Sequence, residues 1–331
     1  MKTLIFKFFC KSFVLLLLLL VTILAFGCKA GITGNLILEE SGKPIEAYFC
    51  PKNDCGKILE NKIRSSNFSA HCAFYDLDLR NVIDALSKKS KSADVKIIID
   101  DANNDNQIKG SSVKFDDNVQ LMHNKFCVID KSTVITGSFN PTDNDNNYNN
   151  NNIIIIESKF LAENYENEFE ELWNGQFGKG GKAIYPKFYL NNAEIQNYFC
   201  PEDECAQKII GLIGDAEKSV YFMAFSFTNG GIADAIIKKD SLDVKGIFDS
   251  GQASSQYSQY KRMKEFGIDV IKDKNKYKMH HKVFIIDNET VVTGSFNPTL
   301  SGDTRNDENI LIIRDKNIAS LYLKEFDSLW Q

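Results

Sequence analysis

Short apolar runs alternate along this chain with amphipathic stretches, a pattern that predicts strands alternating with helices. In the second half we expect strands near Tyr198 and at 219–225, 244–248 and 310–313, and helices at 204–212, 231–239 and 254–266. The first half repeats this order with strands at 68–74, 95–99 and 153–156 and a helix at 80–88, without an evident counterpart of the 254–266 helix. Alternating strands and helices predict an α/β sandwich in each half.

The repeat extends to individual residues, so the chain is an internal duplication. One motif consists of a His, a Lys two residues later, four apolar residues and an Asp, followed by a G-S-F-N segment at 137–140 and again at 294–297. Each residue of the second copy lies 157 positions after its counterpart in the first. The motif residues are His123, Lys125 and Asp130 in the first half and His280, Lys282 and Asp287 in the second.

The motif carries chemistry suited to a phosphate group. Side chains alternate between the faces of a strand, so His280 and Lys282 point the same way, and a nucleophile or proton donor lies beside a cation. The apolar run at 283–286 is typical of a strand buried between layers. Covalent hydrolysis of a phosphodiester requires one imidazole to attack phosphorus and another to protonate the leaving oxygen, and two copies supply both.

These residues resemble the phospholipase D superfamily, whose signature is H-x-K-x4-D followed by G-S-x-N. The second half is also similar to the small bacterial endonucleases and cardiolipin hydrolases of that superfamily, through residues 225–228, the motif and residues 305–309. The resemblance covers roughly residues 45–330. It implies two tandem phospholipase D-like α/β/α sandwich domains related by duplication, with one active site at their pseudo-twofold interface, so that a monomer is active.

The resemblance also implies roles for particular residues. His123, Lys125, His280 and Lys282 are the expected catalytic residues, and neither a metal nor another cofactor is expected. Asn140, Ser138, Asn297 and Ser295 are the expected phosphate-binding residues. Asn151 and Glu308 occupy equivalent positions before the closing strands, where the superfamily orients the catalytic His.

The difference between these two positions leads to a hypothesis about the two His residues. A carboxylate partner favours the protonated imidazole and an amide favours the neutral one. We therefore expect His123, beside Asn151, to be the nucleophile, and His280, beside Glu308, to be the general acid.

Other residues of the motif region are expected to be structural. Four apolar residues separate each motif Asp from its Lys, so Asp130 and Asp287 reach the strand end and are expected to form hydrogen bonds or ion pairs there. His281 lies on the opposite face of its strand from His280, and His71 is likewise expected to be structural.

The chain is long enough for two domains, and its 43% hydrophobic content is sufficient for their cores. We expect a signal peptide or membrane anchor at 1–28, a first domain at 30–177, a linker at 178–190 and a second domain at 191–331. Three Lys residues precede an apolar run at 13–26, and Cys28 follows it. Cys28 is therefore either an acylated lipoprotein residue or the end of an uncleaved anchor, and the protein is expected to be exported, either membrane-anchored or extracellular.

Six further cysteines bear on the compartment. Cys50, Cys55, Cys200 and Cys205 form two repeated C-P-x3-C pairs, which in an exported protein indicate disulfides within or between the pairs. A structural zinc held by the four thiolates is the alternative. Cys72 and Cys127 lie in strand patterns and are expected to be plain buried residues.

The expected function is a phosphodiesterase, and its substrate is either nucleic acid or phospholipid. The net charge of -5 shows no broad basic face. Lys272, Lys274, Lys276 and Lys278 form a candidate track for nucleic acid, although they alternate with neutral and acidic residues as in a solvated loop. A phosphate-binding module of the same fold without catalysis is the rival hypothesis.

Overall fold

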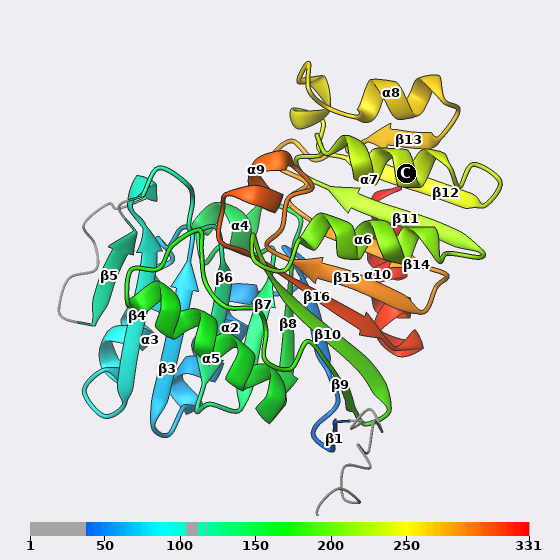
Figure 1. Cartoon of the computed structure of the whole chain (residues 1–331). Coiled ribbons are helices and arrows are strands. Elements are labelled where there is room, and N and C mark those ends of the chain that lie inside the picture. The colour runs from blue at the N-terminus through cyan, green and yellow to red at the C-terminus, as the bar shows by residue number, and fades with distance from the viewer. Residues whose placement is uncertain (1–37, 104–111, 117, 331) are drawn as a thin grey trace, which may run out of the picture. The chain divides into compact units, whose positions relative to one another are not determined.

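Two mixed β-sheets, one for each half of the sequence, form the framework of the computed structural model (Figure 1). The structure describes residues 38–103, 112–116 and 118–330, so the predicted segment at 1–28 and Cys28 lie outside the described residues. Residues from Leu38 onward form one compact unit that contains both sheets. No helix in the described ranges is long and apolar enough to cross a membrane.

The first half folds around a seven-stranded sheet with the order β2-β8-β7-β6-β3-β4-β5. Its strands are β2 (Glu46–Cys50), β3 (Ser69–Phe74), β4 (Asp94–Asp100), β5 (Val113–Asp116), β6 (Lys125–Ile129), β7 (Thr133–Gly137) and β8 (Asn151–Glu157). Its helices are α2 (Cys55–Ser65), α3 (Arg80–Lys89), α4 (Asp143–Asn147) and α5 (Lys159–Trp173).

The second half folds around a nine-stranded sheet with the order β1-β9-β10-β16-β15-β14-β11-β12-β13. Its strands from the second half are β9 (Lys187–Leu190), β10 (Ala193–Cys200), β11 (Ser219–Ala224), β12 (Asp243–Phe248), β13 (Asp269–Lys272), β14 (Lys282–Ile286), β15 (Thr290–Gly294) and β16 (Glu308–Arg314). The edge strand β1 (Glu39–Glu40) comes from the first half of the sequence and pairs in parallel with β9. Its helices are α6 (Cys205–Gly214), α7 (Gly230–Ile237), α8 (Tyr260–Glu265), α9 (Leu300–Thr304) and α10 (Lys316–Leu329).

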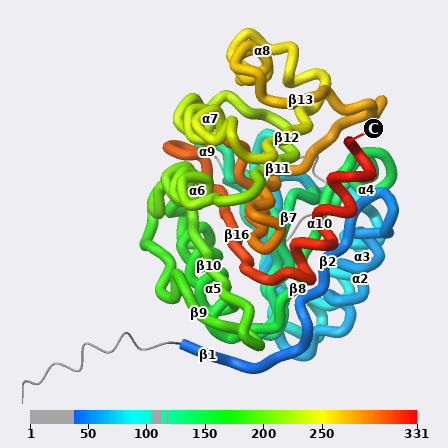
Figure 2. The backbone as a smooth tube through the Cα atoms, turned by 90° about the vertical axis from the view of Figure 1, so that its right-hand side faces the viewer, coloured from blue at the N-terminus to red at the C-terminus, as the bar shows by residue number. Residues whose placement is uncertain are grey.

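Each sheet is covered by helices on both faces, because its central strands are apolar on both sides. Along β14, Phe284 and Ile286 pack in one cluster with α6, α7 and α8, whereas Val283 and Ile285 pack in another with α5 and α10. The corresponding outer cluster of the first half contains α2 and α3. Helix α5 contacts β10 of the other half and α10 contacts β2 (Figure 2), so the inner cluster joins both halves into one core.

The α/β class and the duplication are confirmed, and two local expectations are corrected. The predicted 254–266 helix is reduced to α8, Tyr260–Glu265. Lys187–Leu190, which we placed in the linker, form β9 and pair with β10. Phe74 lies opposite Lys125 as Ala224 lies opposite Lys282. The counterpart of Phe225 is therefore Tyr75, and the apolar runs on either side made this register ambiguous in the sequence.

Candidate active site

Both copies of the motif lie at the boundary between the two halves. Lys125 and Lys282 are the first residues of β6 and β14, and each motif His lies two residues earlier in the entering loop. The backbone N–H of His123 donates to the carbonyl of Asp307 (3.0 Å), and that of His280 donates to the carbonyl of Asn150 (2.8 Å). Each loop thus pairs with the segment before the closing strand of the other half, a reciprocal arrangement typical of a twofold interface.

The His-orienting residues are exchanged between the halves, which corrects our expected pairing. His123 Nδ1 lies 2.9 Å from Glu308 Oε2, and His280 Nδ1 lies 2.9 Å from Asn151 Oδ1. We had paired each His with the residue of its own half, because sequence order alone does not show which closing strand faces which motif. The amide partner therefore belongs to His280 and the carboxylate partner to His123.

The hydrogen bonds of Asn151 determine which nitrogen of His280 carries its proton. Asn151 Nδ2 faces the carbonyls of Asp145 (3.3 Å) and Asn149 (3.4 Å), so Asn151 Oδ1 must be the atom that faces the ring. An amide oxygen only accepts, and His280 Nδ1 is consequently the donor. Nε2 of a neutral His280 then carries a free lone pair.

The two motif lysines are buried and held in the same way. Lys125 Nζ donates to the carbonyl of His123 (2.6 Å), and Lys282 Nζ donates to the carbonyl of His280 (2.7 Å). Burial lowers the pKa of Lys125 to about 8, and burial together with the charge of Lys125 holds the pKa of Lys282 well below its ordinary range. A bound anion would relieve this repulsion, so the pair is suited to a phosphate.

His123 and Glu308 together hold one proton near neutral pH. Burial raises the pKa of Glu308 to about 8. Burial, with the charges of Lys125 and Lys282, holds the pKa of His123 well below its usual value. Whether the proton lies on the carboxyl or on Nδ1, Nε2 of His123 retains its own hydrogen and can donate it.

The expected phosphate-binding residues divide into two groups. Ser138 and Ser295 are fully buried, and their hydroxyls donate to Asn151 (3.3 Å) and Glu308 (2.6 Å). In the structure the serines have the His-orienting residues as partners, and phosphate binding by the serines stays a prediction. Asn140 and Asn297 follow in the loops beside the motifs, with Asn297 Oδ1 accepting from the Ser226 backbone (3.5 Å).

Three residues at this interface were missed by the sequence reasoning. The rings of Tyr75 and Phe225 pack edge-on against His123 and His280, with a centroid distance of 4.8 Å in both cases. Each ring directly follows a strand, β3 or β11, and these equivalent positions were a usable signal in the sequence. The third is Asp145 of α4, a buried residue whose Oδ2 lies 3.4 Å from His280 Nδ1. Its Asn-rich surroundings gave no motif to mark it.

The motif Asp residues hold the ends of strands. Asp130 accepts backbone N–H bonds from Asn67 (2.7 Å), Phe68 (2.8 Å) and Ser69 (3.0 Å) at the start of β3. Asp287 accepts from the equivalent segment at 217–219. The pKa of Asp130 lies below its ordinary value, because these backbone donors outweigh burial, which acts in the opposite direction.

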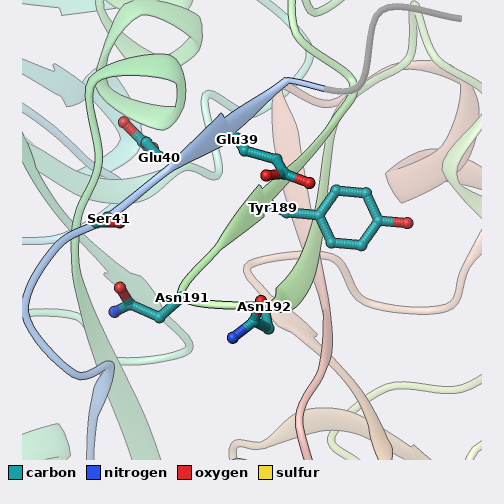
Figure 3. Close-up of a pocket in the computed structure, with 6 residues that line it drawn as sticks. All are labelled: Glu39, Glu40, Ser41, Tyr189, Asn191 and Asn192. Atoms are coloured by element: carbon teal, nitrogen blue, oxygen red, sulfur yellow. The ribbon is translucent and has the colours of Figure 1, made fainter.

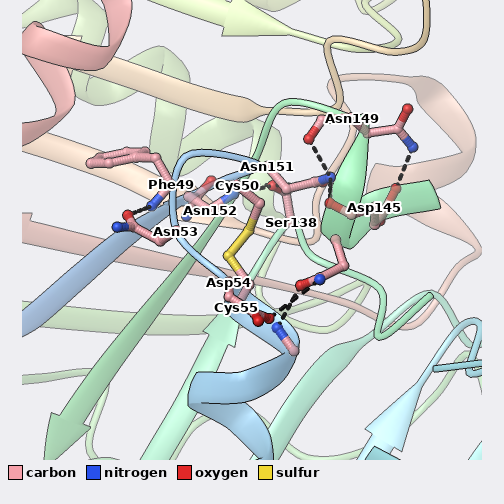
Figure 4. The surroundings of a disulfide bond; sticks show 12 residues. Phe49, Cys50, Asn53, Asp54, Cys55, Ser138, Asp145, Asn149, Asn151 and Asn152 are labelled. Carbon is pink, nitrogen blue, oxygen red and sulfur yellow. Dashed lines mark hydrogen bonds between the residues drawn. A yellow bond between two sulfur atoms is a disulfide. The ribbon is translucent and has the colours of Figure 1, made fainter. Parts of the chain in front are cut away.

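The cysteines are joined in three disulfides. Cys50 is bonded to Cys55 at the start of α2 (Figure 4), and Cys200 is bonded to Cys205 at the start of α6, so each C-P-x3-C pair closes on itself. Cys72 of β3 is bonded to Cys127 of β6, which corrects the expectation that these two are plain buried residues. Antiparallel pairing of β3 with β6 places them directly opposite each other, a proximity that their separation in the sequence conceals.

The two remaining His residues lie outside the reacting pair. Nδ1 of His281 lies 3.1 Å from Asn152 Oδ1 in the buried layer beneath the motifs. His71 is grouped with Glu166 and Glu170 closely enough to hold a metal ion. However, His71 Nδ1 already lies 2.8 Å from Glu166, and its Nε2 lies 3.2 Å from Asp94, so the group is a hydrogen-bonded network.

A surface pocket of about 620 Å³ lies beside β1 and β9 (Figure 3). It is lined by Glu39, Glu40, Ser41, Tyr189, Asn191 and Asn192. None of these residues belongs to either motif, and its two carboxylates would repel a phosphate. The chemistry therefore points to the motif interface.

Comparison with known proteins identifies similar chains. The sequence matches the family described as "Cardiolipin synthase, PLD-like domain" over residues 59–173 and 209–330. A phospholipase D of Rickettsia prowazekii (strain Madrid E) is 33% identical over 178 residues, which are 53% of this chain and 84% of that protein. A mitochondrial cardiolipin hydrolase of Chlamydomonas reinhardtii is 32% identical over 125 residues, 37% of this chain and 56% of that protein. A phosphatidylserine synthase structure from Haemophilus influenzae Rd KW20 has the same fold, with a TM-score of 0.65 at 13% identity over 88% of this chain and 86% of that chain.

The hydrogen bonds of Asp130 predict a pH-dependent loss of stability in Asp130→Asn. At pH 7 the variant should lose about 1–3 kcal/mol of unfolding free energy, since an amide group replaces a charged acceptor of backbone donors. A carboxylate with a lowered pKa contributes stability above its unfolded pKa and loses it as the pH falls. The difference from the native chain, measured by urea denaturation, should therefore shrink between pH 7 and pH 3.

Asp84→Asn is the matched control, because Asp84 is an exposed residue on α3. It should leave the urea midpoint nearly unchanged at both pH values. An Asp130→Asn loss that is equally large at pH 7 and pH 3 would contradict this account of the carboxylate.

Proposed function

On the premise that this chain belongs to the cardiolipin synthase, PLD-like domain family, as its two matched segments show, we propose that it hydrolyses phosphodiester bonds through a covalent phosphohistidine. Family membership and the named relatives support a phosphodiesterase-type enzyme of the phospholipase D superfamily. The observation that carries the proposal is the exchange of His partners across the interface. It gives one His a free Nε2 lone pair and the other an Nε2 hydrogen.

His280 is the proposed nucleophile, which reverses our initial hypothesis because the partners are exchanged. Its Nε2 attacks phosphorus and forms a P–N bond while the bond from phosphorus to the leaving oxygen breaks. The Nε2 hydrogen of His123 moves to that oxygen, so the first product leaves as an alcohol.

In the second half-reaction His123 acts as a base. It takes a proton from water, whose oxygen attacks phosphorus and breaks the P–N bond. The phosphomonoester is released, and both imidazoles return to their starting protonation states. Lys125 and Lys282, with Asn140 and Asn297, are proposed to stabilise the charge on the phosphoryl oxygens without a metal.

The substrate is proposed to be a phosphodiester of nucleic acid or of a phospholipid. The names of the relatives favour a phospholipid, with cardiolipin as one candidate. A pair of exposed aromatic rings beside the site favours single-stranded nucleic acid. Tyr148 and Tyr277 stack with their centroids 4.5 Å apart and are 40% and 52% exposed. Such rings can stack on bases.

This pair of rings is closely connected to His280. Asn275 Nδ2 donates to the carbonyls of Tyr148 (3.0 Å) and Lys278 (3.3 Å), and Lys278 lies two residues before His280. The equivalent positions on the other side of the interface are Gln120 and Arg305. These two positions thus carry aromatic rings on the side that holds the proposed nucleophile and polar side chains on the other side.

Export and membrane attachment remain part of the proposal. Three disulfides are typical of proteins in oxidising compartments, and a Lys-flanked apolar run precedes Cys28. We propose that the chain is exported and either tethered through its N-terminus or released, and that it acts as a monomer because one chain holds both motifs.

Trapping the intermediate tests the mechanism. With bis(p-nitrophenyl) phosphate the leaving group needs no protonation, so His123→Asn should still form the phosphohistidine but should not hydrolyse it. We expect a burst of about one nitrophenolate per active site and a p-nitrophenylphosphoryl group mapped by mass spectrometry to His280. His280→Asn should give neither, and EDTA should not slow the native enzyme.

A p-nitrophenylphosphoryl group mapped to His123 in the His280→Asn variant would reverse the assignment of the two roles. Inactivity of the native chain on this ester, on nucleic acid and on phospholipid vesicles would favour the rival hypothesis of a phosphate-binding module.

The shared proton of His123 and Glu308 predicts the alkaline limb of the pH profile. The Nε2 hydrogen of His123 is lost when Glu308, with its pKa raised to about 8, gives up the shared proton. An acid form is present below its pKa and is lost above it, so kcat/KM for natural phosphodiesters should fall as the pH rises through about 8. Lys125, with its pKa lowered to about 8, acts in the same direction.

A substrate with a nitrophenolate leaving group separates these two causes, because its departure needs no acid. With that substrate, loss of the His123 proton should no longer lower the burst rate at alkaline pH. Loss of the Lys125 proton should still lower it. If the burst rate falls at alkaline pH as steeply as kcat/KM for natural phosphodiesters, the His123–Glu308 pair does not supply the proton.

The stacked tyrosines predict a substrate-dependent effect of Tyr277→Ala. If bases stack there, kcat/KM for single-stranded DNA should fall about 5- to 150-fold, the kinetic equivalent of one lost stacking contact. Turnover of bis(p-nitrophenyl) phosphate, which carries no nucleobase, should change little. Tyr257→Ala is the matched control, since Tyr257 is 69% exposed and outside the stacked pair. A loss confined to phospholipid vesicles would assign the rings to a lipid surface.

A further inference from the structure

A carboxylate that belongs to neither motif lies against the proposed nucleophile. Asp145 is 4% exposed, and its Oδ2 lies 3.4 Å from Nδ1 of His280, the nitrogen that also donates to Asn151. Within the described part of the chain, it is the carboxylate that has an oxygen within 4.0 Å of a ring nitrogen of His280.

The two halves place their carboxylates differently. In the second half the acid is Glu308, at the start of the closing strand, and the position equivalent to Asp145 is Gly302. In the first half the position equivalent to Glu308 is the neutral Asn151, and the acid is Asp145 of α4. Each half nevertheless presents one carboxylate to the His of the other half.

Because Asp145 presents to His280 the carboxylate that position 151 lacks, we propose that Asp145 is a positioning residue for the reaction of His280. It stabilises the positive charge on the His280 ring when Nε2 bonds to phosphorus. This inference rests on the proposed function. Asn151 orients the ring through its oxygen but has no net charge to offer. Asp145 supplies that charge while leaving Nε2 unprotonated before attack, because both partners bind the hydrogen on Nδ1.

The other charged groups around His280 make this role necessary. Lys282 of β14 and Lys125 of β6 both lie close enough to disfavour an imidazolium, as burial does. A phosphorylated imidazole with a hydrogen on Nδ1 carries the same positive charge. The negative charge of Asp145 therefore offsets the unfavourable effect of the two lysines on a positively charged His280 ring.

Asp145 is held firmly enough to act in this way. Its Oδ2 accepts from the backbone N (2.8 Å) and Nδ2 (2.9 Å) of Asn140, and its Oδ1 accepts from Asn149 Nδ2 (2.5 Å; Figure 4). Asn146, the next residue on α4, accepts from the Gly56 N–H (2.7 Å) and so docks α4 on the start of α2. These donors stabilise the charged form, and although burial opposes ionisation, His280 holds the pKa of Asp145 below its usual range.

The first test compares Asp145→Asn with Asp143→Asn in the full chain. Asp143 lies on the same short helix but is exposed, so its variant should retain native kinetics. Asp145→Asn should lower the rate of phosphohistidine formation about 100-fold, the scale of one lost electrostatic contact to a developing charge. KM should change less than kcat. A change in KM alone would mean that Asp145 serves only to hold Asn140.

The second test moves the carboxylate to the place that it occupies in the other half. Asp145→Gly should lose activity like Asp145→Asn, and adding Asn151→Glu should restore most of it, because the double variant reproduces Gly302 and Glu308. Ser138 already donates to residue 151 as Ser295 donates to residue 308. Failure of the double variant to recover, while it remains folded by circular dichroism, would overturn the proposal.

A third measurement does not depend on turnover. Nitrogen-15 NMR of His280 should show a ring that protonates at lower pH in Asp145→Asn than in the native chain, with the native titration recovered in Asp145→Gly/Asn151→Glu. An unchanged titration in Asp145→Asn would overturn the proposal. If the native chain cleaves no phosphodiester while the titration shifts as described, the proposed function fails and the contact between Asp145 and His280 stands.

Discussion

The structure depends on an exchange of hydrogen-bond partners between its two halves. A buried imidazole needs a partner at Nδ1 if its Nε2 is to be presented in a defined protonation state. Here that partner always comes from the other half: Glu308 for His123 and Asn151 for His280. Neither half contains a complete site, and the shared inner core of α5 and α10 holds the two incomplete sites together.

A second exchange of polar contacts lies beneath the first. Asn152 is fully buried and donates to Thr293 (2.8 Å) and Tyr322 (3.0 Å) of the second half. Asn309, its counterpart, donates to Asn124 (2.7 Å) and accepts from Tyr165 (3.1 Å) of the first half. Because buried amides are costly without partners, sliding one half against the other would leave several unsatisfied groups. This layer therefore specifies the register in which the two motifs meet.

Much of this arrangement could be predicted from the sequence, for identifiable reasons. The strands predicted at 68–74, 95–99 and 310–313 follow from apolar runs, and the duplicated motif made the twofold relation of the halves predictable. The partner exchange could not be predicted, since Asn151 and Glu308 follow their own motifs in the chain and only the packing of the sheets brings each to the opposite one. Asp145 was missed because it lies in an Asn-rich segment with no periodic pattern, and Cys72 and Cys127 because their strands meet only after folding.

The central claim is that one phosphoryl group is bound between the two halves, with each His oriented by the other half. The most direct measurement is a crystal structure of the full chain with vanadate, which imitates the phosphoryl group in transfer. The account predicts vanadium bonded to Nε2 of His280, an apical oxygen facing Nε2 of His123, and both Nδ1 atoms hydrogen-bonded across the interface. Vanadate held within one half, or either His turned toward the closing strand of its own half, would contradict it.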